Sequence, residues 1–242
     1  MRIDRLGARG EADSGVVTDD LVTADRSPGV RDDGGRALDD KMRASTRTFC
    51  QMPAAYIHAD RFPECIPDIP ASLATRLLGC ARLQPDLSQL ILEHYHLEEC
   101  TEADFVDTPS HFCLLDAEEL RRLGELAGGV WHARSLRSIV LGRELATILA
   151  DFDPQLHGLA LENVDLSPEP ARPLDPATLA EAIRRDGMHC LSAFFARLSA
   201  PLRRRVLLKF PEGSPVGSLV SELHAALGPL IIDRIAERAL MP

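Results

Sequence analysis

The chain has 242 residues, of which 45% are hydrophobic and 26% charged, and its formal net charge is -10. A chain of this size and balance is expected to bury a sizeable core in one or two soluble domains. The negative charge argues against a broad nucleic-acid footprint and against binding to an anionic membrane surface. No apolar run approaches the roughly 20 residues of a membrane span, so direct membrane insertion is not expected. The N-terminus also lacks the apolar core of a secretory signal peptide.

Residues 1–45 differ in composition from the rest of the chain. They contain no aromatic residue, cysteine or histidine, and Asp, Arg and Gly dominate, as in the run Arg31–Arg36. Such a segment buries too little apolar area to offset its ordering entropy, so we predict a disordered N-terminal tail. A second explanation stays open, in which the true translation start is Met42 and the preceding residues are a mis-assigned start.

An aromatic and proline-rich segment follows the tail. It reads FCQMPAAYIH over residues 49–58 and continues as ADRFP over residues 59–63. This run resembles the opening of the type III secretion sorting-platform K proteins, the YscK/SctK-like family. Those proteins begin with a similar aromatic-x-x-x-Pro-Ala-x-Tyr-x-His run and then a short proline-rich turn. The Cys50-Gln51 pair and the added tail depart from that pattern. For Tyr56 and His58 we favour an extended strap packed over helices rather than a contact surface.

The resemblance implies a small cytoplasmic adaptor that lies at the inner membrane only through its partners. Its partners would be the cytoplasmic domain of the inner-membrane ring protein and the pod (C-ring-like) protein of the secretion system. The resemblance implies no cofactor and no catalysis, and the protein would be required for protein export. It places no partner contact on an individual residue of this chain.

Beyond the strap the hydrophobic pattern has a helical period nearly throughout. Asp116, followed three residues later by Glu119, predicts a capping box, and the helix behind it is predicted to stop at Gly128-Gly129. The helices expected in this half of the chain cover about 71–83, 85–97, 117–127, 130–140, 143–152 and 154–163.

The second half is predicted to begin after a proline-rich extended connector at 164–174. Asp175-Pro176 is a strong helix start, and the helices expected behind it cover about 175–198, 201–209 and 216–240, the last interrupted by Gly228-Pro229. We therefore predict an all-α, irregular multi-helix protein with four segments: the tail at 1–45, an N-terminal helical part at 46–163, the connector at 164–174, and a C-terminal helical part at 175–242.

The sequence contains no established catalytic motif, so an enzyme is not expected. It has no phosphate-binding loop, no nucleophile elbow and no zinc-protease helix. The best metal candidate is His94-x-His96-x-x-x-Cys100, with His111 and Cys113 nearby. This spacing matches no established zinc finger, so we interpret the set as a partly exposed histidine pair and two core cysteines, and we predict no metal and no cofactor. The six cysteines include no C-x-x-C pair and are predicted to be reduced thiols.

Three residues are the candidates for partner binding: Trp131, the only tryptophan, and the arginines Arg203 and Arg204. Tryptophan and arginine are enriched among the residues that dominate binding energy at interfaces. The Arg203–Arg205 run and Lys209 are predicted to form a basic edge, although a solvated helix face explains the same pattern. The acidic stretch at 98–107 is likewise explained by a solvated loop.

Two other functional hypotheses remain open from the sequence. The first is a helical regulatory or chaperone-like interaction protein outside secretion. The second is a metal-dependent helical enzyme built on His94, His96 and Cys100. Gene neighbourhood would separate the adaptor from the regulator, and metal analysis of the purified protein would test the enzyme.

Overall fold

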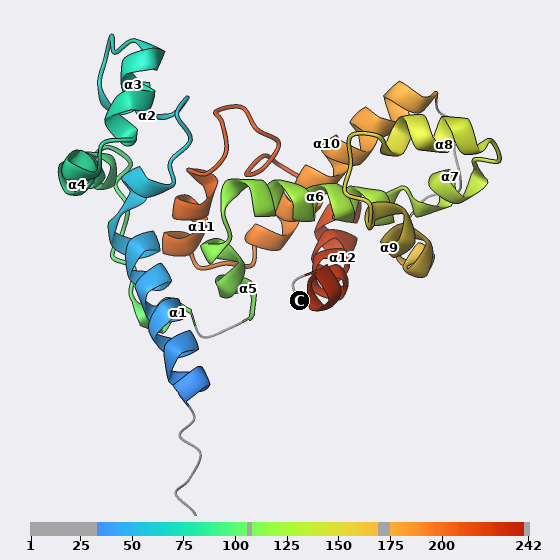
Figure 1. Ribbon diagram of the computed structural model, residues 1–242, viewed down its shortest axis with the longest axis horizontal. Helices are drawn as coiled ribbons and strands as arrows, with labels where there is room; N and C mark the ends of the chain where they lie inside the picture. The colour runs from blue at the N-terminus through green and yellow to red at the C-terminus, as the bar shows by residue number, and fades with distance from the viewer. Residues whose placement is uncertain (1–32, 106–107, 169–174, 240–242) are drawn as a thin grey trace, which may run out of the picture.

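The computed structural model describes residues 33–105, 108–168 and 175–239. Every regular element in these ranges is helical (Figure 1), which confirms the predicted all-α, multi-helix fold. The α-helices are α1 (Asp33–Gln51), α2 (Phe62–Cys65), α3 (Ala71–Leu78), α4 (Gln84–His94), α5 (Thr108–His111), α6 (Ala117–Trp131), α7 (Ala133–Ser138), α8 (Gly142–Leu149), α9 (Leu156–Glu162), α10 (Pro176–Phe195), α11 (Ala200–Leu207) and α12 (Glu222–Ala239). None of these helices combines the length and the apolar composition that crossing a bilayer requires.

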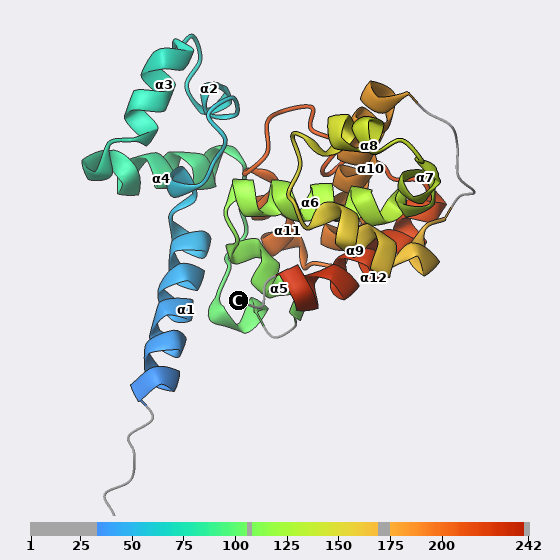
Figure 2. The same ribbon diagram turned by 45° about the vertical axis from the view of Figure 1, so that its right-hand side comes forward.

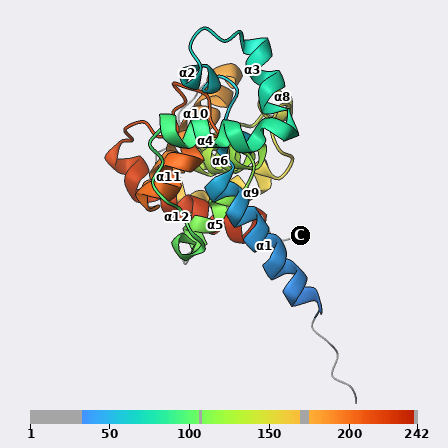
Figure 3. The same ribbon diagram turned by 90° about the vertical axis from the view of Figure 1, so that its left-hand side faces the viewer.

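The predicted tail falls mostly outside the described residues. Residues 33–45 are described, however, and they form the first part of helix α1. Figures 2 and 3 show α1 extending away from the body that the later helices form. Its packing against that body begins near its C-terminal end, where Thr46, Phe49 and Cys50 are buried.

The main hydrophobic core lies where α10 packs along α6 and α12 (Figure 1). Leu120, Leu191, Phe194 and Ile232 are among the side chains that this packing removes completely from solvent. Each such side chain contributes about 1.5–3 kcal/mol of hydrophobic stabilisation. Of the connector predicted at 164–174, residues 169–174 lie outside the described residues. Helices from both sides of it contribute to this one core.

Two helix starts confirm the local signals in the sequence. Asp116 accepts a hydrogen bond from the Glu119 amide at 2.8 Å, and the Glu119 carboxylate accepts one from the Asp116 amide at 2.7 Å. Asp175 caps α10 by accepting from the Thr178 amide at 3.1 Å, with Pro176 in the first turn. Both arrangements satisfy amide groups that have no partner inside the helix.

The predicted helix stop at Gly128-Gly129 is wrong, because α6 continues through both glycines to Trp131. The glycines permit close packing instead. A Cβ atom on Gly128 would lie 1.9 Å from the carbonyl oxygen of Ile183 in α10, and one on Gly187 would lie 1.9 Å from that of Gly124. Only residues without a side chain allow the two helix backbones to approach this closely.

The interruption predicted at Gly228-Pro229 is also wrong, since α12 continues through both residues. A Cβ atom on Gly228 would lie 2.9 Å from the Cα atom of Cys190 in α10. The glycine therefore serves the packing of α12 on α10, and this packing keeps the helix continuous despite the proline.

Residues 53–62 and helices α2–α4 form a second, smaller apolar cluster, and Figure 2 shows these helices beside the main body. Phe62 and Ile91 are fully buried at its centre, and Ala54 and Ile57 of the strap pack with them. Leu208, which directly follows α11, belongs to the same cluster. This residue connects the smaller cluster to the C-terminal helices.

Candidate partner-binding surface around helix α11

The strap, defined here as residues Phe49–His58, folds back on itself at the end of α1. The rings of Phe49 and Tyr56 stack with centroids 5.2 Å apart, and the Tyr56 hydroxyl donates to the Phe49 carbonyl oxygen at 2.8 Å. The edge of the Phe105 ring completes the group, with its centroid 5.9 Å from that of Phe49. Burial raises the pKa of Tyr56, so this hydroxyl stays a hydrogen-bond donor.

Lys209 lies against these two rings although only 4% of its surface is exposed. Its Nζ atom is 5.2 Å from the Phe49 centroid and 5.3 Å from the Tyr56 centroid, distances at which a cation attracts an aromatic face. The same atom donates to the carbonyl oxygens of Cys113, at 2.6 Å, and Leu115. Burial lowers the pKa of this amine to about 8.

The strap and the residues just after it also donate hydrogen bonds to backbone carbonyl oxygens that follow α11. The His58 amide donates to the Leu208 carbonyl oxygen at 2.7 Å, and Arg61 Nε donates to the Phe210 carbonyl oxygen at 2.7 Å. These contacts agree with the packing of Tyr56 and His58 over the helices, but the segment is not extended as predicted, because Phe49–Gln51 end α1 and Pro53–Ala55 form a 3-10 helix. The aromatic and proline-rich motif thus packs against α11 and the residues that follow it.

Arg205 of α11 is the largest fully buried side chain, with 2% of its surface exposed. Its Nε donates to the Cys50 carbonyl oxygen and its guanidinium NH1 to the Pro201 carbonyl oxygen, each at 3.2 Å. None of the ion pairs found within the described ranges includes Arg205. Burial lowers the pKa of its guanidinium, and the charge is held by carbonyl dipoles.

The burial of Arg205 and Lys209 corrects the predicted basic edge. Arg205 lies on the inward face of α11 with buried Leu202 and Val206, and Lys209 lies buried in the turn that follows the helix. The spacing of Arg205 relative to these apolar residues is the signal in the sequence that could have placed it inward. Arg203 and Arg204 remain exposed, as expected for partner-binding candidates.

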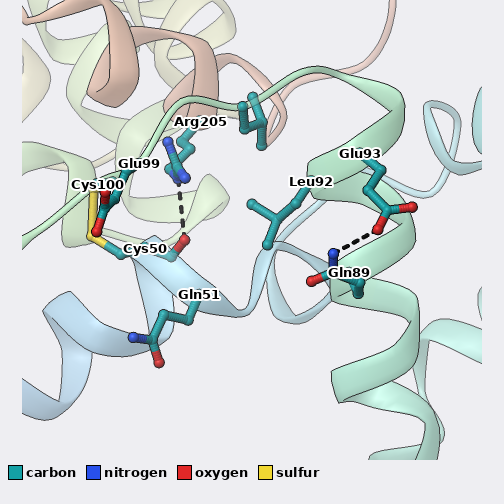
Figure 4. Close-up of a pocket in the computed structure, with 9 residues that line it drawn as sticks. Cys50, Gln51, Gln89, Leu92, Glu93, Glu99, Cys100 and Arg205 are labelled. Carbon is teal, nitrogen blue, oxygen red and sulfur yellow. Dashed lines mark hydrogen bonds between the residues drawn. A yellow bond between two sulfur atoms is a disulfide. The ribbon is translucent and has the colours of Figure 1, made fainter.

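A pocket of about 490 Å³ opens beside α11, between the end of α1 and α4 (Figure 4). The side chains of Leu92, Glu93, Glu99 and Arg205 are part of its lining. Figure 4 shows Arg205 reaching the Cys50 carbonyl oxygen next to a disulfide between Cys50 and Cys100.

This disulfide contradicts the prediction that all six cysteines are free. Cys50 and Cys100 are 50 positions apart, and the packing of the strap against the α4–α5 segment brings their Cα atoms to 5.2 Å. No spacing rule could reveal such a long-range pair. The other four cysteines, Cys65, Cys80, Cys113 and Cys190, are in no disulfide.

The residues of the metal candidate are not gathered into a site. Cys100 is bonded to Cys50, and both His94 and His96 are exposed. Over the described ranges, no group of three or more His, Cys, Asp or Glu side chains has an arrangement that could hold a metal ion.

The exposed edge of α11 borders the acidic stretch at 98–107, of which residues 106–107 lie outside the described ranges. Arg204 NH1 is 3.4 Å from Glu98 Oε1 and donates to the His96 carbonyl oxygen at 3.4 Å. Both side chains of this ion pair are about half exposed, so a competing charge on a partner could replace either one. Arg203 has no ion pair within the described residues. The surface thus places cationic and anionic groups side by side.

The third candidate, Trp131, lies away from this surface. It is 7% exposed and stacks on His224 of α12 with a centroid distance of 4.0 Å. Its backbone carbonyl oxygen accepts from the Ser167 hydroxyl at 2.8 Å. Trp131 therefore connects α6 and α12 in the interior, which leaves little of its ring for contact with a partner.

The comparison with known families decides which class of protein this is. The family described as YOP proteins translocation protein K (YscK) matches residues 45–240. The chain belongs to the YscK family. The match includes the strap and nearly all of the helical body, so the resemblance first seen in residues 49–63 extends over most of the chain.

Curated relatives agree with membership of the YscK family. The chain is 33% identical over 162 residues to the nodulation protein NolU of Rhizobium fredii, an alignment that covers 66% of this chain and 73% of the relative. The NolU protein of Sinorhizobium fredii (strain NBRC 101917 / NGR234) matches with the same identity and coverage. No solved structure matches the chain significantly. The protein is therefore a type III secretion-related protein.

Proposed function

We propose that this YscK-family protein is a non-enzymatic adaptor of the type III secretion sorting platform. In this role it links the cytoplasmic domain of the inner-membrane ring protein to the pod (C-ring-like) protein and is required for protein export. The observation that carries the proposal is the family match over residues 45–240. The adaptor acts in the cytoplasm, reaches the membrane only through the ring protein, and needs no cofactor.

The surface that supports this role best is the exposed edge of α11 with the adjoining pocket. Arg203 and Arg204 present two guanidinium groups, which bind carboxylates in pairs of hydrogen bonds and are common anchors at interfaces. Behind them, the strap and the two buried cations fix α11 in place. A rigidly held helix loses little freedom when a partner binds, which favours affinity. We assign to this edge the contact with an acidic patch on one of the two partners.

The test is affinity purification of the tagged protein from cells that produce the whole secretion apparatus. The wild-type protein should recover both the pod protein and the ring protein, and an in-frame deletion should stop export while the membrane rings still assemble. Recovery of neither partner, together with normal export in the deletion strain, would refute the adaptor role and favour a helical regulator.

Reversing the charge of exposed arginines tests whether the edge of α11 is the binding surface. The variant Arg203→Glu/Arg204→Glu should lose at least one partner. The matched control is Arg137→Glu/Arg143→Glu, which reverses two exposed arginines in the α7–α8 region and should keep both partners. Equal losses in the two variants would show that net charge, rather than the edge of α11, governs binding.

A further inference from the structure

The disulfide joins two segments that lie 50 positions apart in the chain. Cys50 lies in the last turn of α1, and Cys100 lies in the segment between α4 and the 3-10 helix η3 (Glu102–Asp104). The noncovalent contacts of α1 with the body gather near its C-terminal end, among them the Arg205 hydrogen bond to Cys50, and Figures 2 and 3 show the rest of the helix extending away from the body. Whether these two cysteines are bonded or reduced therefore affects how firmly the C-terminal end of α1 is held to the body.

The same two cysteines line two adjacent pockets. One is the pocket of about 490 Å³ shown in Figure 4, and the other has a volume of about 220 Å³. Both pockets are also lined by Gln51 and Glu99. Small molecules in solvent can thus approach the disulfide, whereas Cys113 and Cys190 are fully buried. Accessibility of this kind distinguishes exchangeable disulfides from inert ones.

We propose that Cys50 and Cys100 form a reversible thiol–disulfide pair that exchanges with a low-molecular-weight thiol such as glutathione. In the closed state the pair fixes the C-terminal end of α1 to the body. In the open state α1 keeps only its noncovalent contacts, among them the stacking of Phe49 on Tyr56. This inference does not depend on the identity of the adaptor's partners.

Atoms and electrons balance in this exchange with glutathione and glutathione disulfide as the only other reactants. A glutathione thiolate attacks the sulfur of Cys100, the more exposed of the two, which forms a mixed disulfide and releases the Cys50 thiolate. A second glutathione thiolate attacks the glutathione sulfur of this mixed disulfide, which releases the Cys100 thiolate and one molecule of glutathione disulfide. Closure is the reverse, in which glutathione disulfide takes up two electrons and the protein loses two.

Arg205 favours this direction of attack. Its guanidinium donates to the Cys50 carbonyl oxygen and lines the same pocket, which places a positive charge beside Cys50, and a nearby positive charge favours a thiolate. A thiolate stabilised in this way is the better leaving group.

The test uses the full-length wild-type protein equilibrated with mixtures of reduced and oxidised glutathione. After quenching with an alkylating reagent, mass spectrometry of peptides should show Cys50 and Cys100 passing together from two alkylated thiols to one internal disulfide. Amide hydrogen exchange in residues 46–51 should slow by about tenfold or more in the closed state. The double variant Cys50→Ser/Cys100→Ser should exchange like the open state in every mixture.

Cys80→Ser provides the control, because Cys80 is a free and partly exposed cysteine outside the pair. This variant should titrate like the wild type. Stable glutathione adducts on Cys50 or Cys100 in place of the internal bond would overturn the proposal. So would equal amide exchange of residues 46–51 in the open and closed states.

Discussion

The Nζ atom of Lys209 donates a hydrogen bond of 2.6 Å to the carbonyl oxygen of Cys113, 96 positions earlier in the chain. This bond joins the end of α11 to the segment that precedes α6, and the rings of Phe49 and Tyr56 cover the same ammonium group. One buried cation thus holds three parts of the chain together: the strap, the segment before α6 and the end of α11. The stability of this junction should depend on the charge of that single amine.

Replacement of Lys209 by methionine should reduce the free energy of unfolding by about 1–3 kcal/mol at pH 7, because the carbonyl oxygens of Cys113 and Leu115 lose their donor. The matched control is Lys41→Met, which removes the only other lysine from an exposed position on α1. Urea denaturation should show no change for this control.

The stability difference between the wild type and Lys209→Met should also depend on pH. The folded-state pKa is lowered from 10.5 to about 8, so below pH 8 both the folded and the unfolded wild type are protonated at this amine. Above pH 8 the folded protein releases the proton while the unfolded chain keeps it. Wild-type stability should therefore rise relative to the variant by up to about 1.4 kcal/mol per pH unit towards pH 10. A constant difference between pH 7 and 10 would contradict the burial of a charged amine.

Gly128→Ala should destabilise the protein by about 3 kcal/mol or more, because the new methyl group meets the backbone of Ile183 in α10. Gly158→Ala is the control, since its Cβ would meet nothing within 4 Å. In helix α9 that change should be neutral or stabilising by up to about 1 kcal/mol. Thermal denaturation measures both, and similar melting temperatures for the two variants would argue against the close contact of α6 and α10.

Trp131→Ala should reduce the free energy of unfolding by about 3–5 kcal/mol, as expected for the loss of a buried ring stacked on His224. Trp131→Phe, which keeps an aromatic ring, should recover much of that loss and bind partners like the wild type. Denaturant titration and affinity purification of the same two variants measure these effects. A folded Trp131→Phe protein that has lost a partner would instead place Trp131 at an interface.

A chain that starts at Met42 should melt within about 2 °C of the full-length protein, a shift that corresponds to roughly half a kcal/mol. The reason is that Lys41 and the residues up to Ala44 are exposed, and the packing of α1 begins at Thr46. Differential scanning calorimetry of the two forms provides the measurement. A drop of several degrees would show that the removed residues pack on the body.

The features that could be predicted from the sequence are those with a local cause. The capping residues Asp116 and Asp175 act on amides three positions away, so their patterns are visible in a short window. Gly128 carries the same local signal for a helix end, but its role is set by Ile183 in another helix. A local pattern contains no information about that neighbour.

The candidate site likewise combines features with a local cause and features that depend on distant parts of the chain. The exposure of Arg203 and Arg204 follows from their place opposite the apolar face of α11, and the motif at 49–58 pointed to the family. The Cys50–Cys100 disulfide and the burial of Trp131 depend on contacts between distant segments. These were therefore wrong or undecided from the sequence alone.

The proposed role of this protein is to bridge two components of the secretion platform. Size-exclusion chromatography with light scattering should be applied to the purified protein, the pod protein and the cytoplasmic domain of the ring protein, singly and in all combinations. We expect one complex that contains all three, and no association of the pod protein with the ring domain when this protein is left out. Direct binding of those two components without it, or binding of only one of them to it at a time, would rule out the proposed bridging role.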